Sequence, residues 1–140
     1  MQSPNETAAP PSTCSARLLI VEDHDLLRES MRLMLESDPD LLVVGEAKDG
    51  QEAIELCRLH RPDLVVMDVR MPRVNGFEAT RKIKEESRAI RVLIVSAYDN
   101  VGLVTEARRV GAEGYVLKLA PLREILKAVR GALKGEPQYP

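Results

Sequence analysis

The sequence contains no tryptophan, one phenylalanine and three tyrosines. With so few aromatic rings, the chain lacks the stacking surface on which single-stranded nucleic acids bind. Its net charge of −2 also gives no basic footprint for DNA or RNA. No apolar run reaches the length of about 20 residues that a transmembrane helix needs, and the N-terminus lacks the order of charges and apolar residues that marks a secretory signal. We therefore expect a cytoplasmic protein with no membrane partner.

Cysteine is scarce as well, since only Cys14 and Cys57 are present. Two cysteines cannot build a disulfide framework, which favours a reducing compartment. Cys14 falls within residues 1–15, a stretch of Pro, Ser, Thr and Ala that has little to bury and is expected to be a disordered leader. Cys57 lies among apolar residues at helical spacing and is expected in the core.

From residue 16 onward, short apolar segments alternate with stretches whose apolar residues recur at helical spacing. The apolar segments predict five strands, at residues 18–21, 41–47, 64–67, 92–95 and 114–117. Asp38-Pro39, Asp49-Gly50, Asp99-Asn100 and Pro121 supply signals that start or stop helices, and a further helix is expected over about residues 76–86. Such alternation is typical of an α/β protein with a parallel sheet. We predict a flavodoxin-like (βα)5 fold with strand order 2-1-3-4-5 and helices on both faces.

Polar residues stand at the ends of four of these strands. Glu22-Asp23 follows the first strand, Asp68 the third, Ser96 the fourth and Lys118 the fifth. The carboxyl ends of parallel strands share one edge, and with the predicted order the first and third strands are neighbours. Carboxylates that converge there repel one another unless a cation lies between them, and oxygen ligands suit Mg²⁺. The alternative is that each residue merely ends a strand at the surface.

This set of residues suggests that a carboxylate, Asp68, captures a phosphoryl group. A metal ion and Lys118 would stabilise the charge of the transferring group, and Ser96 adds a hydroxyl donor. His24, beside the acidic pair, is interpreted as a loop residue at a helix entry, because oxygen ligands suit Mg²⁺ better than imidazole.

Over residues 17–134 the chain resembles the receiver domains of two-component response regulators. The resemblance is carried by an ordered set of motifs: Glu22-Asp23, Asp68 with Met71-Pro72 and Asn75-Gly76, Ser96-Ala97, and Gly114-Tyr115 with Lys118. It implies a protein that accepts phosphate from a sensor histidine kinase or a small phosphodonor and is not itself a turnover enzyme. Residues 16–134 are then the receiver domain.

The resemblance also implies a role for each site residue. Asp68 is the expected phosphoacceptor, and Lys118 holds a phosphoryl oxygen. Mg²⁺ is bound by Asp23, Asp68 and the backbone carbonyl of Arg70, with Glu22 acting through water. Ser96 turns to the phosphoryl group and Tyr115 follows it inward as the switch aromatic, which changes the surface around the fourth helix, fifth strand and fifth helix.

Three positions depart from the usual receiver pattern. Glu22 stands where Asp is more common, and Leu119 stands where many receivers have a proline, so the isomer of the peptide after Lys118 is left open. Tyr98 places a bulky residue beside the site. We hypothesise that Tyr98 and Arg70 hinder the hydrolytic water and prolong the phosphorylated state.

A narrower resemblance is to NarL/FixJ (LuxR-type) regulators, carried by Val21-Glu22-Asp23-His24, Leu117-Lys118-Leu119-Ala120-Pro121 and the ending Gly135-Glu136-Pro137-Gln138-Tyr139-Pro140. It implies that residues 135–140 begin a linker to a helix-turn-helix domain outside this sequence, that DNA is bound only through that domain, and that phosphorylation promotes a homodimer. The alternatives are a stand-alone receiver or phosphorelay module, a carboxylate-nucleophile phosphatase, and an interaction module that is never phosphorylated.

Overall fold

The computed structural model describes residues 15–140, so the predicted leader and Cys14 lie outside the described residues apart from Ser15. Five strands alternate with five helices. The elements are β1 (Ala16–Val21), α1 (Asp25–Glu36), β2 (Leu41–Ala47), α2 (Gly50–His60), β3 (Leu64–Met67), α3 (Gly76–Glu86), β4 (Arg91–Ser96), α4 (Val101–Arg109), β5 (Gly114–Leu117) and α5 (Leu122–Leu133). All strands are parallel, in the order β2-β1-β3-β4-β5. The predicted fold and strand order are confirmed.

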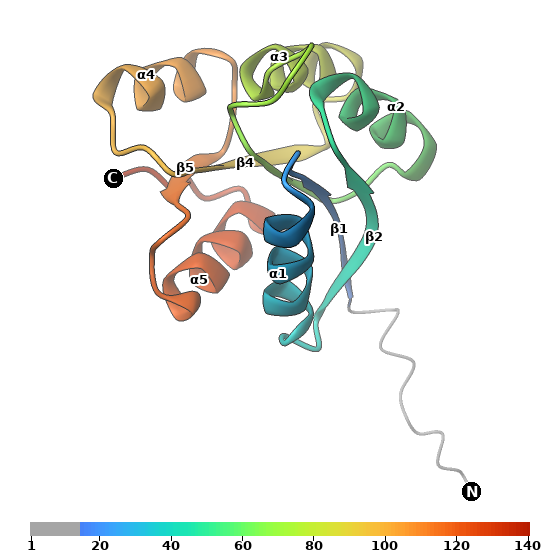
Figure 1. Cartoon of the computed structure of the whole chain (residues 1–140), viewed down its shortest axis with the longest axis vertical. Coiled ribbons are helices and arrows are strands. Elements are labelled where there is room, and N and C mark those ends of the chain that lie inside the picture. The colour runs from blue at the N-terminus through green and yellow to red at the C-terminus, as the bar shows by residue number, and fades with distance from the viewer. Residues whose placement is uncertain (1–14) are drawn as a thin grey trace, which may run out of the picture.

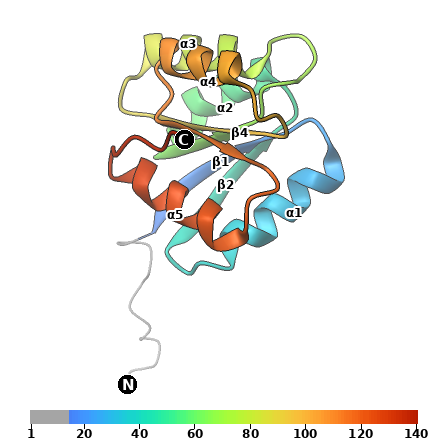
Figure 2. The same cartoon turned by 90° about the vertical axis from the view of Figure 1, so that its left-hand side faces the viewer.

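The sheet separates two layers of helices. Helices α1 and α5 cover one face, and α2, α3 and α4 cover the other (Figures 1 and 2). Each layer has its own apolar core, because residues on alternate positions of a strand point to opposite faces. In β1, Leu18 and Ile20 pack toward α1 and α5, whereas Leu19 and Val21 join the core under α2, α3 and α4. The central strand β3 is buried along its whole length.

Polar residues set where three of the helices begin. The Asp49 side chain accepts a hydrogen bond from the Glu52 N–H at the start of α2, and the Asn100 side chain accepts one from Leu103 N–H in α4. Asn75 forms a reciprocal capping box with Glu78 at the start of α3. Helices α1 and α5 differ, because their N-cap residues His24 and Pro121 make no side-chain capping bond.

The strand register brings the ends of β1, β3 and β4 to one edge. Val21 pairs with Met67, and the Asp68 N–H donates to the Val21 carbonyl at 3.0 Å. The Lys118 N–H donates to the Ser96 carbonyl at 2.8 Å. Residues that follow these strands are therefore adjacent in space, as the predicted sheet requires.

After α5 the chain returns to the free edge of β5. Gln138 forms a parallel bridge with Gly114, its N–H donates to the Glu113 carbonyl, and its own carbonyl accepts from the Tyr115 N–H. Tyr139 lies under the Arg108 guanidinium, 4.0 Å from the ring centroid, and donates from its hydroxyl to the Ala112 carbonyl. The predicted linker therefore packs against the domain in this structure.

The described residues include no helix with both the length and the apolarity needed to cross a bilayer.

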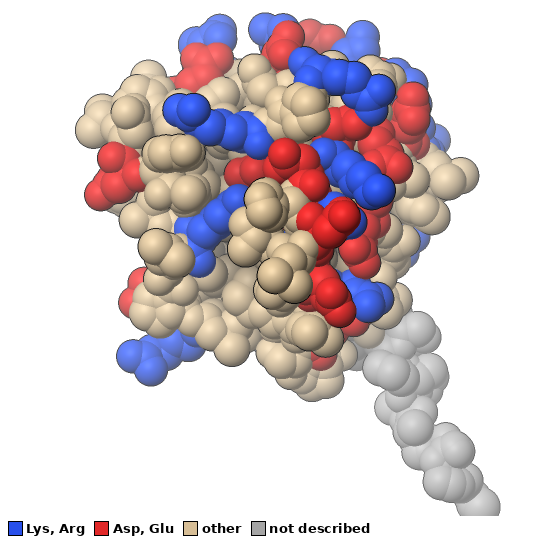
Figure 3. All heavy atoms as spheres, in the orientation of Figure 1, with Lys and Arg blue, Asp and Glu red and all other residues tan. Residues whose placement is uncertain are grey.

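Lys and Arg side chains alternate with Asp and Glu side chains over the face shown in Figure 3, with no area of a single sign. Cys57 is a buried free thiol, as predicted.

Candidate functional site

Three carboxylates meet where β1 and β3 end. Glu22, Asp23 and Asp68 each place one carboxylate oxygen within 4.8 Å of the others. Glu22 and Asp68 are buried and Asp23 is exposed. The predicted convergence of these acids is therefore present, and oxygen donors of this kind are those that Mg²⁺ prefers. The residues fit a divalent ion, so this acidic pocket can bind Mg²⁺.

Lys118, at the end of β5, points into the same pocket. Its Nζ lies 2.6 Å from Glu22 Oε1 and 3.3 Å from Asp68 Oδ1. Burial opposes its charge, but the hydrogen bond to Glu22 and the charge of Asp68 outweigh that cost and raise the pKa of Lys118. Lys118 is therefore a firmly charged ammonium group that touches two of the three acids.

Asp68 is the acid whose protonation the pocket changes most clearly. Burial, followed by the nearby charge of Glu22, raises the pKa of Asp68 to about 6, although Lys118 acts in the opposite direction. Desolvation disfavours a carboxylate, and a like charge adds to that effect. A cation bound beside Asp68 would stabilise the ionised carboxylate and so offset both the burial and the repulsion by Glu22.

The loop after Asp68 approaches the strand end closely at Gly76. The Gly76 N–H donates to the Val69 carbonyl at 2.9 Å, and a Cβ built on Gly76 would lie 2.1 Å from the Asp68 carbonyl oxygen. Only glycine leaves room for this contact. The same loop is tied to α2 by an ion pair between Arg73 and the buried Asp49.

Ser96 and Tyr115, the predicted switch residues, both contact Tyr98. The Ser96 hydroxyl accepts a hydrogen bond from the Tyr98 N–H at 3.1 Å, and the Tyr115 hydroxyl donates to the Tyr98 carbonyl at 2.5 Å. Tyr115 is buried, so its ring already points inward in this structure. Within residues 15–140, no hydrogen bond joins Ser96 to Asp68.

Arg70 and Tyr98 lie together beside the pocket, as the hypothesis about the hydrolytic water requires. The Arg70 guanidinium stacks over the Tyr98 ring at 4.4 Å from its centroid. This contact joins the loop after β3 to the loop after β4. A shallow groove lined by Asp23, Arg70, Pro72 and Phe77 runs next to it. The peptide bond between Lys118 and Leu119 is trans.

Sequence reasoning missed Arg28, which contacts the turn that carries the acidic pair. It also missed the ion pair between Arg73 and Asp49. Arg28 stands three residues after Asp25, a spacing that favours an ion pair on a helix, and this is the one local signal that pointed to it. Its bond to Glu22 depends on how the turn folds and leaves no pattern in the sequence.

Comparison with known proteins identifies the family. The family model for the response regulator receiver domain matches residues 18–130, and the chain belongs to this family. It is 36% identical over 119 residues to the transcriptional regulatory protein DegU of Brevibacillus brevis, covering 85% of this chain and 50% of that protein. It is 37% identical over 121 residues to the nitrate/nitrite response regulator protein NarL of Escherichia coli K12, covering 86% of this chain and 56% of NarL.

Among solved structures, the chain is similar to a LuxR-family two-component response regulator from Aurantimonas sp. SI85-9A1, with a TM-score of 0.86, 38% identity and 89% of each chain covered. The present chain spans about half the length of the curated relatives that it matches. It is thus a receiver domain of the LuxR (NarL/FixJ) type of response regulator.

Proposed function

We propose that this domain is a phosphorylation switch in which Asp68 accepts a phosphoryl group. The observation that carries the proposal is the pocket itself: Asp68 lies at a strand end, 3.3 Å from the Lys118 ammonium and beside two further acids. A carboxylate oxygen of Asp68 forms the new bond to phosphorus, while the bond from phosphorus to the donor's nitrogen or oxygen breaks and the donor leaves with that electron pair.

Each neighbouring residue has a role in this proposal. Asp23 and Asp68 would hold Mg²⁺ together with the Arg70 carbonyl, Glu22 would act through water, and the ion would supply positive charge for the phosphoryl oxygens. Lys118 already carries its charge beside Asp68, so it can pair with a phosphoryl oxygen without gaining a proton. Phosphatases with a carboxylate nucleophile commonly carry a second acid near it, where this chain has Arg70, so the residues suit a phosphoacceptor better than a phosphatase.

The switch follows from the contacts of Ser96. Phosphorylation replaces the single negative charge of the Asp68 carboxylate with a phosphoryl group of about −1.5 to −2 charges, whose oxygens can accept a hydrogen bond from a hydroxyl donor. If Ser96 turns to the phosphoryl group, Tyr98 N–H loses its acceptor and the loop before α4 must rearrange. The Tyr115 hydroxyl donates to the carbonyl of the same Tyr98. The rearrangement therefore reaches the surface formed by α4, β5 and α5. This surface is the proposed site of homodimerisation.

The cellular role is inferred from the relatives. We assign a sensor histidine kinase as the phosphodonor and a cytoplasmic location, as is general for response regulators. DegU is described as a transcriptional regulatory protein, which supports a transcriptional output for this chain too. Residues 16–134 form the switch, and residues 135–140 begin the linker to a helix-turn-helix domain that binds DNA.

The deciding experiment is incubation with acetyl phosphate and Mg²⁺, followed by intact-mass measurement. We expect one phosphoryl adduct on the wild-type chain and none on Asp68→Asn. Asp63→Asn is the matched control, because Asp63 precedes β3 at the opposite end of the same strand, and it should be phosphorylated like the wild type. No adduct on the wild type would point to an interaction module, and continued release of phosphate from a monoester substrate would point to a phosphatase.

A further inference from the structure

The turn between β1 and α1 carries the acidic pair but lacks the usual helix cap. His24 at the N-cap position makes no side-chain capping bond, whereas α2, α3 and α4 are each capped by a side chain. Within residues 15–140, no hydrogen bond or ion pair holds the Asp23 carboxylate. The position of Asp23 therefore depends on whatever fixes the backbone of this turn.

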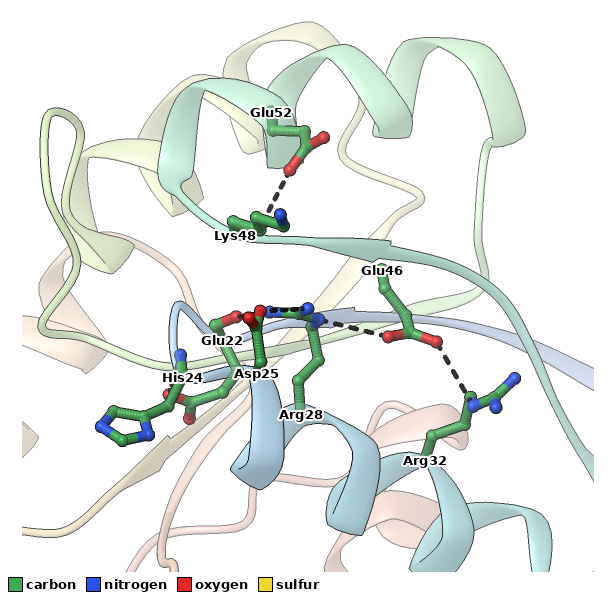
Figure 4. Close-up of polar contacts among 8 residues, drawn as sticks. All are labelled: Glu22, His24, Asp25, Arg28, Arg32, Glu46, Lys48 and Glu52. Atoms are coloured by element: carbon green, nitrogen blue, oxygen red, sulfur yellow. Dashed lines mark hydrogen bonds and ion pairs between the residues drawn. The ribbon is translucent and has the colours of Figure 1, made fainter.

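The Glu22 N–H donates to the Ala47 carbonyl in β2, and the Arg28 side chain supplies a further contact. Its Nη1 donates to the Glu22 carbonyl at 2.8 Å, its Nη2 to Asp25 Oδ1 at 2.7 Å, and its Nε to Glu46 Oε1 in β2 at 3.2 Å. Only 12% of its side chain is exposed. Figure 4 shows the guanidinium between Glu22 and Asp25 on one side and Glu46 on the other. A planar guanidinium with five donors can join three oxygens in this way, and an ammonium group cannot match that geometry.

Glu22 links this contact to the pocket. Its carbonyl accepts from Arg28, its Oε2 accepts from the His24 N–H at 3.1 Å, and its Oε1 accepts from Lys118 at 2.6 Å. Arg28 thus holds the backbone of the buried Glu22, and Lys118 holds its side chain. A loss of the Arg28 bond would leave the Glu22 backbone held by the bond from its N–H to the Ala47 carbonyl at 3.0 Å, which loosens the turn at the residue just before Asp23.

We propose that Arg28 is a positioning residue for the metal site: it holds the turn so that Glu22 and Asp23 lie beside Asp68. This inference rests on the proposed function, since it assumes that the acidic pocket binds Mg²⁺. Arg28 itself is bonded to no carboxylate oxygen of the pocket, so it acts through the backbone. Groups that orient metal ligands in this way have large effects on affinity.

The sign of the effect separates positioning from simple electrostatics. Arg28 is a positive charge near a cation site, and removing it makes the neighbourhood more negative. Coulomb attraction alone would then strengthen Mg²⁺ binding. If Arg28 positions the acids, its removal weakens binding instead. The two explanations therefore predict changes in opposite directions.

Arg32 provides a matched control on the same helix. It lies one turn after Arg28 and its Nε pairs with Glu46 Oε2 at 3.3 Å. Among the described residues it bonds to Glu46 alone and to no atom of the β1–α1 turn. Arg28→Met and Arg32→Met remove the same charge and keep a long apolar stem. They differ in the bonds of Arg28 to the Glu22 carbonyl and to Asp25, both in or beside the β1–α1 turn, and in burial, since the Arg32 side chain is 45% exposed.

The experiment is a calorimetric Mg²⁺ titration of the whole chain and its variants, without phosphodonor. We expect Arg28→Met to weaken Mg²⁺ binding by about tenfold or more, the range seen when groups that orient metal ligands are removed. Arg32→Met should bind Mg²⁺ as the wild type does or slightly more tightly. Arg28→Lys keeps the charge but loses the planar guanidinium that joins three oxygens, so this variant should still bind Mg²⁺ more weakly than the wild type does.

A second measurement needs no metal. The His24 amide donates to Glu22 Oε2, so its hydrogen exchange reports the order of the turn. Exchange should accelerate in Arg28→Met and stay unchanged in Arg32→Met. If Arg28→Met unfolds, Arg28→Lys decides the question. Wild-type affinity in the Arg28 variants would overturn the inference, whereas failure of the wild type to bind Mg²⁺ would overturn the proposed function instead.

Discussion

Asp68→Asn is expected to stabilise the domain at neutral pH when divalent ions are removed. The Asp68 side chain is 9% exposed, and burial together with the charge of Glu22 raises its pKa from an ordinary 3.8 to about 6. Each unit of pKa shift corresponds to about 1.4 kcal/mol, so the ionised carboxylate costs the folded state about 3 kcal/mol. Asparagine has nearly the same shape and no charge, and it avoids this cost.

The raised pKa also fixes the pH window. Because the folded state favours the protonated form of Asp68, the contribution of this group to stability is complete below about pH 4. It is lost as the pH rises through about 6. The advantage of Asp68→Asn over the wild type should therefore grow between about pH 4 and 6 and level off above about pH 7, at about 2–3 kcal/mol.

Urea unfolding in the presence of EDTA, at several pH values between about 4.5 and 7.5, measures this difference. Asp49→Asn is a control of opposite sign. Burial disfavours the Asp49 charge, but the Glu52 N–H and Arg73 outweigh burial and lower the pKa of Asp49. That variant should be less stable than the wild type at neutral pH, and its deficit should shrink on acidification below 3.8, the ordinary pKa of an Asp side chain.

Millimolar Mg²⁺ should reduce the advantage of Asp68→Asn, because a bound cation pairs with the carboxylate that the variant lacks. An Asp68→Asn variant that is no more stable than the wild type at pH 7.5 would refute the reasoning. So would an advantage that does not change with pH, because it could not arise from ionisation of Asp68.

Two other changes test the loops around the site. Gly114→Ala would place a Cβ 2.6 Å from the Gln138 carbonyl oxygen, so it should displace the C-terminal segment from β5 at a cost of about 1–3 kcal/mol. Hydrogen exchange at the Gln138 amide should then accelerate, and continued protection of that amide would show that the segment stays in place. Tyr98→Ala removes the ring that stacks on Arg70, a contact worth about 0.5–1 kcal/mol, so the phosphorylated form should lose phosphate about two- to fivefold faster. Dephosphorylation is followed by intact mass, and an unchanged rate would count against a shielding role for this pair.

Most of the fold could be predicted from local signals in the sequence. The apolar strands and the caps at Asp49 and Asn100 define where most elements lie, because each signal acts within a few residues, whereas the capping box of Asn75 and Glu78 was not predicted. β1 begins two residues earlier than predicted, at Ala16, whose N–H donates to the Asp40 carbonyl. The packing of Gln138 on β5 could not be predicted, since it depends on the path of the chain after α5.

The site was predicted to a similar extent. The meeting of Glu22, Asp23, Asp68 and Lys118 follows from the positions of polar residues at strand ends once the strand order is known. The pairing of Lys118 with Glu22 at 2.6 Å was not predicted, because the resemblance gave the lysine to the phosphoryl group alone.

Tyr98 connects the parts of the molecule that the proposed switch must link. Its ring contacts Arg70 beside the pocket, its N–H donates to Ser96, and its carbonyl accepts from Tyr115. The Tyr115 N–H in turn donates to the carbonyl of Gln138. A phosphoryl group on Asp68 that draws the Ser96 hydroxyl away removes one of the three contacts of Tyr98. Whether Tyr115 then keeps its bond to Tyr98 decides how firmly β5 and the C-terminal segment are held. Tyr98 therefore couples the chemistry at Asp68 to the packing of the residues after α5.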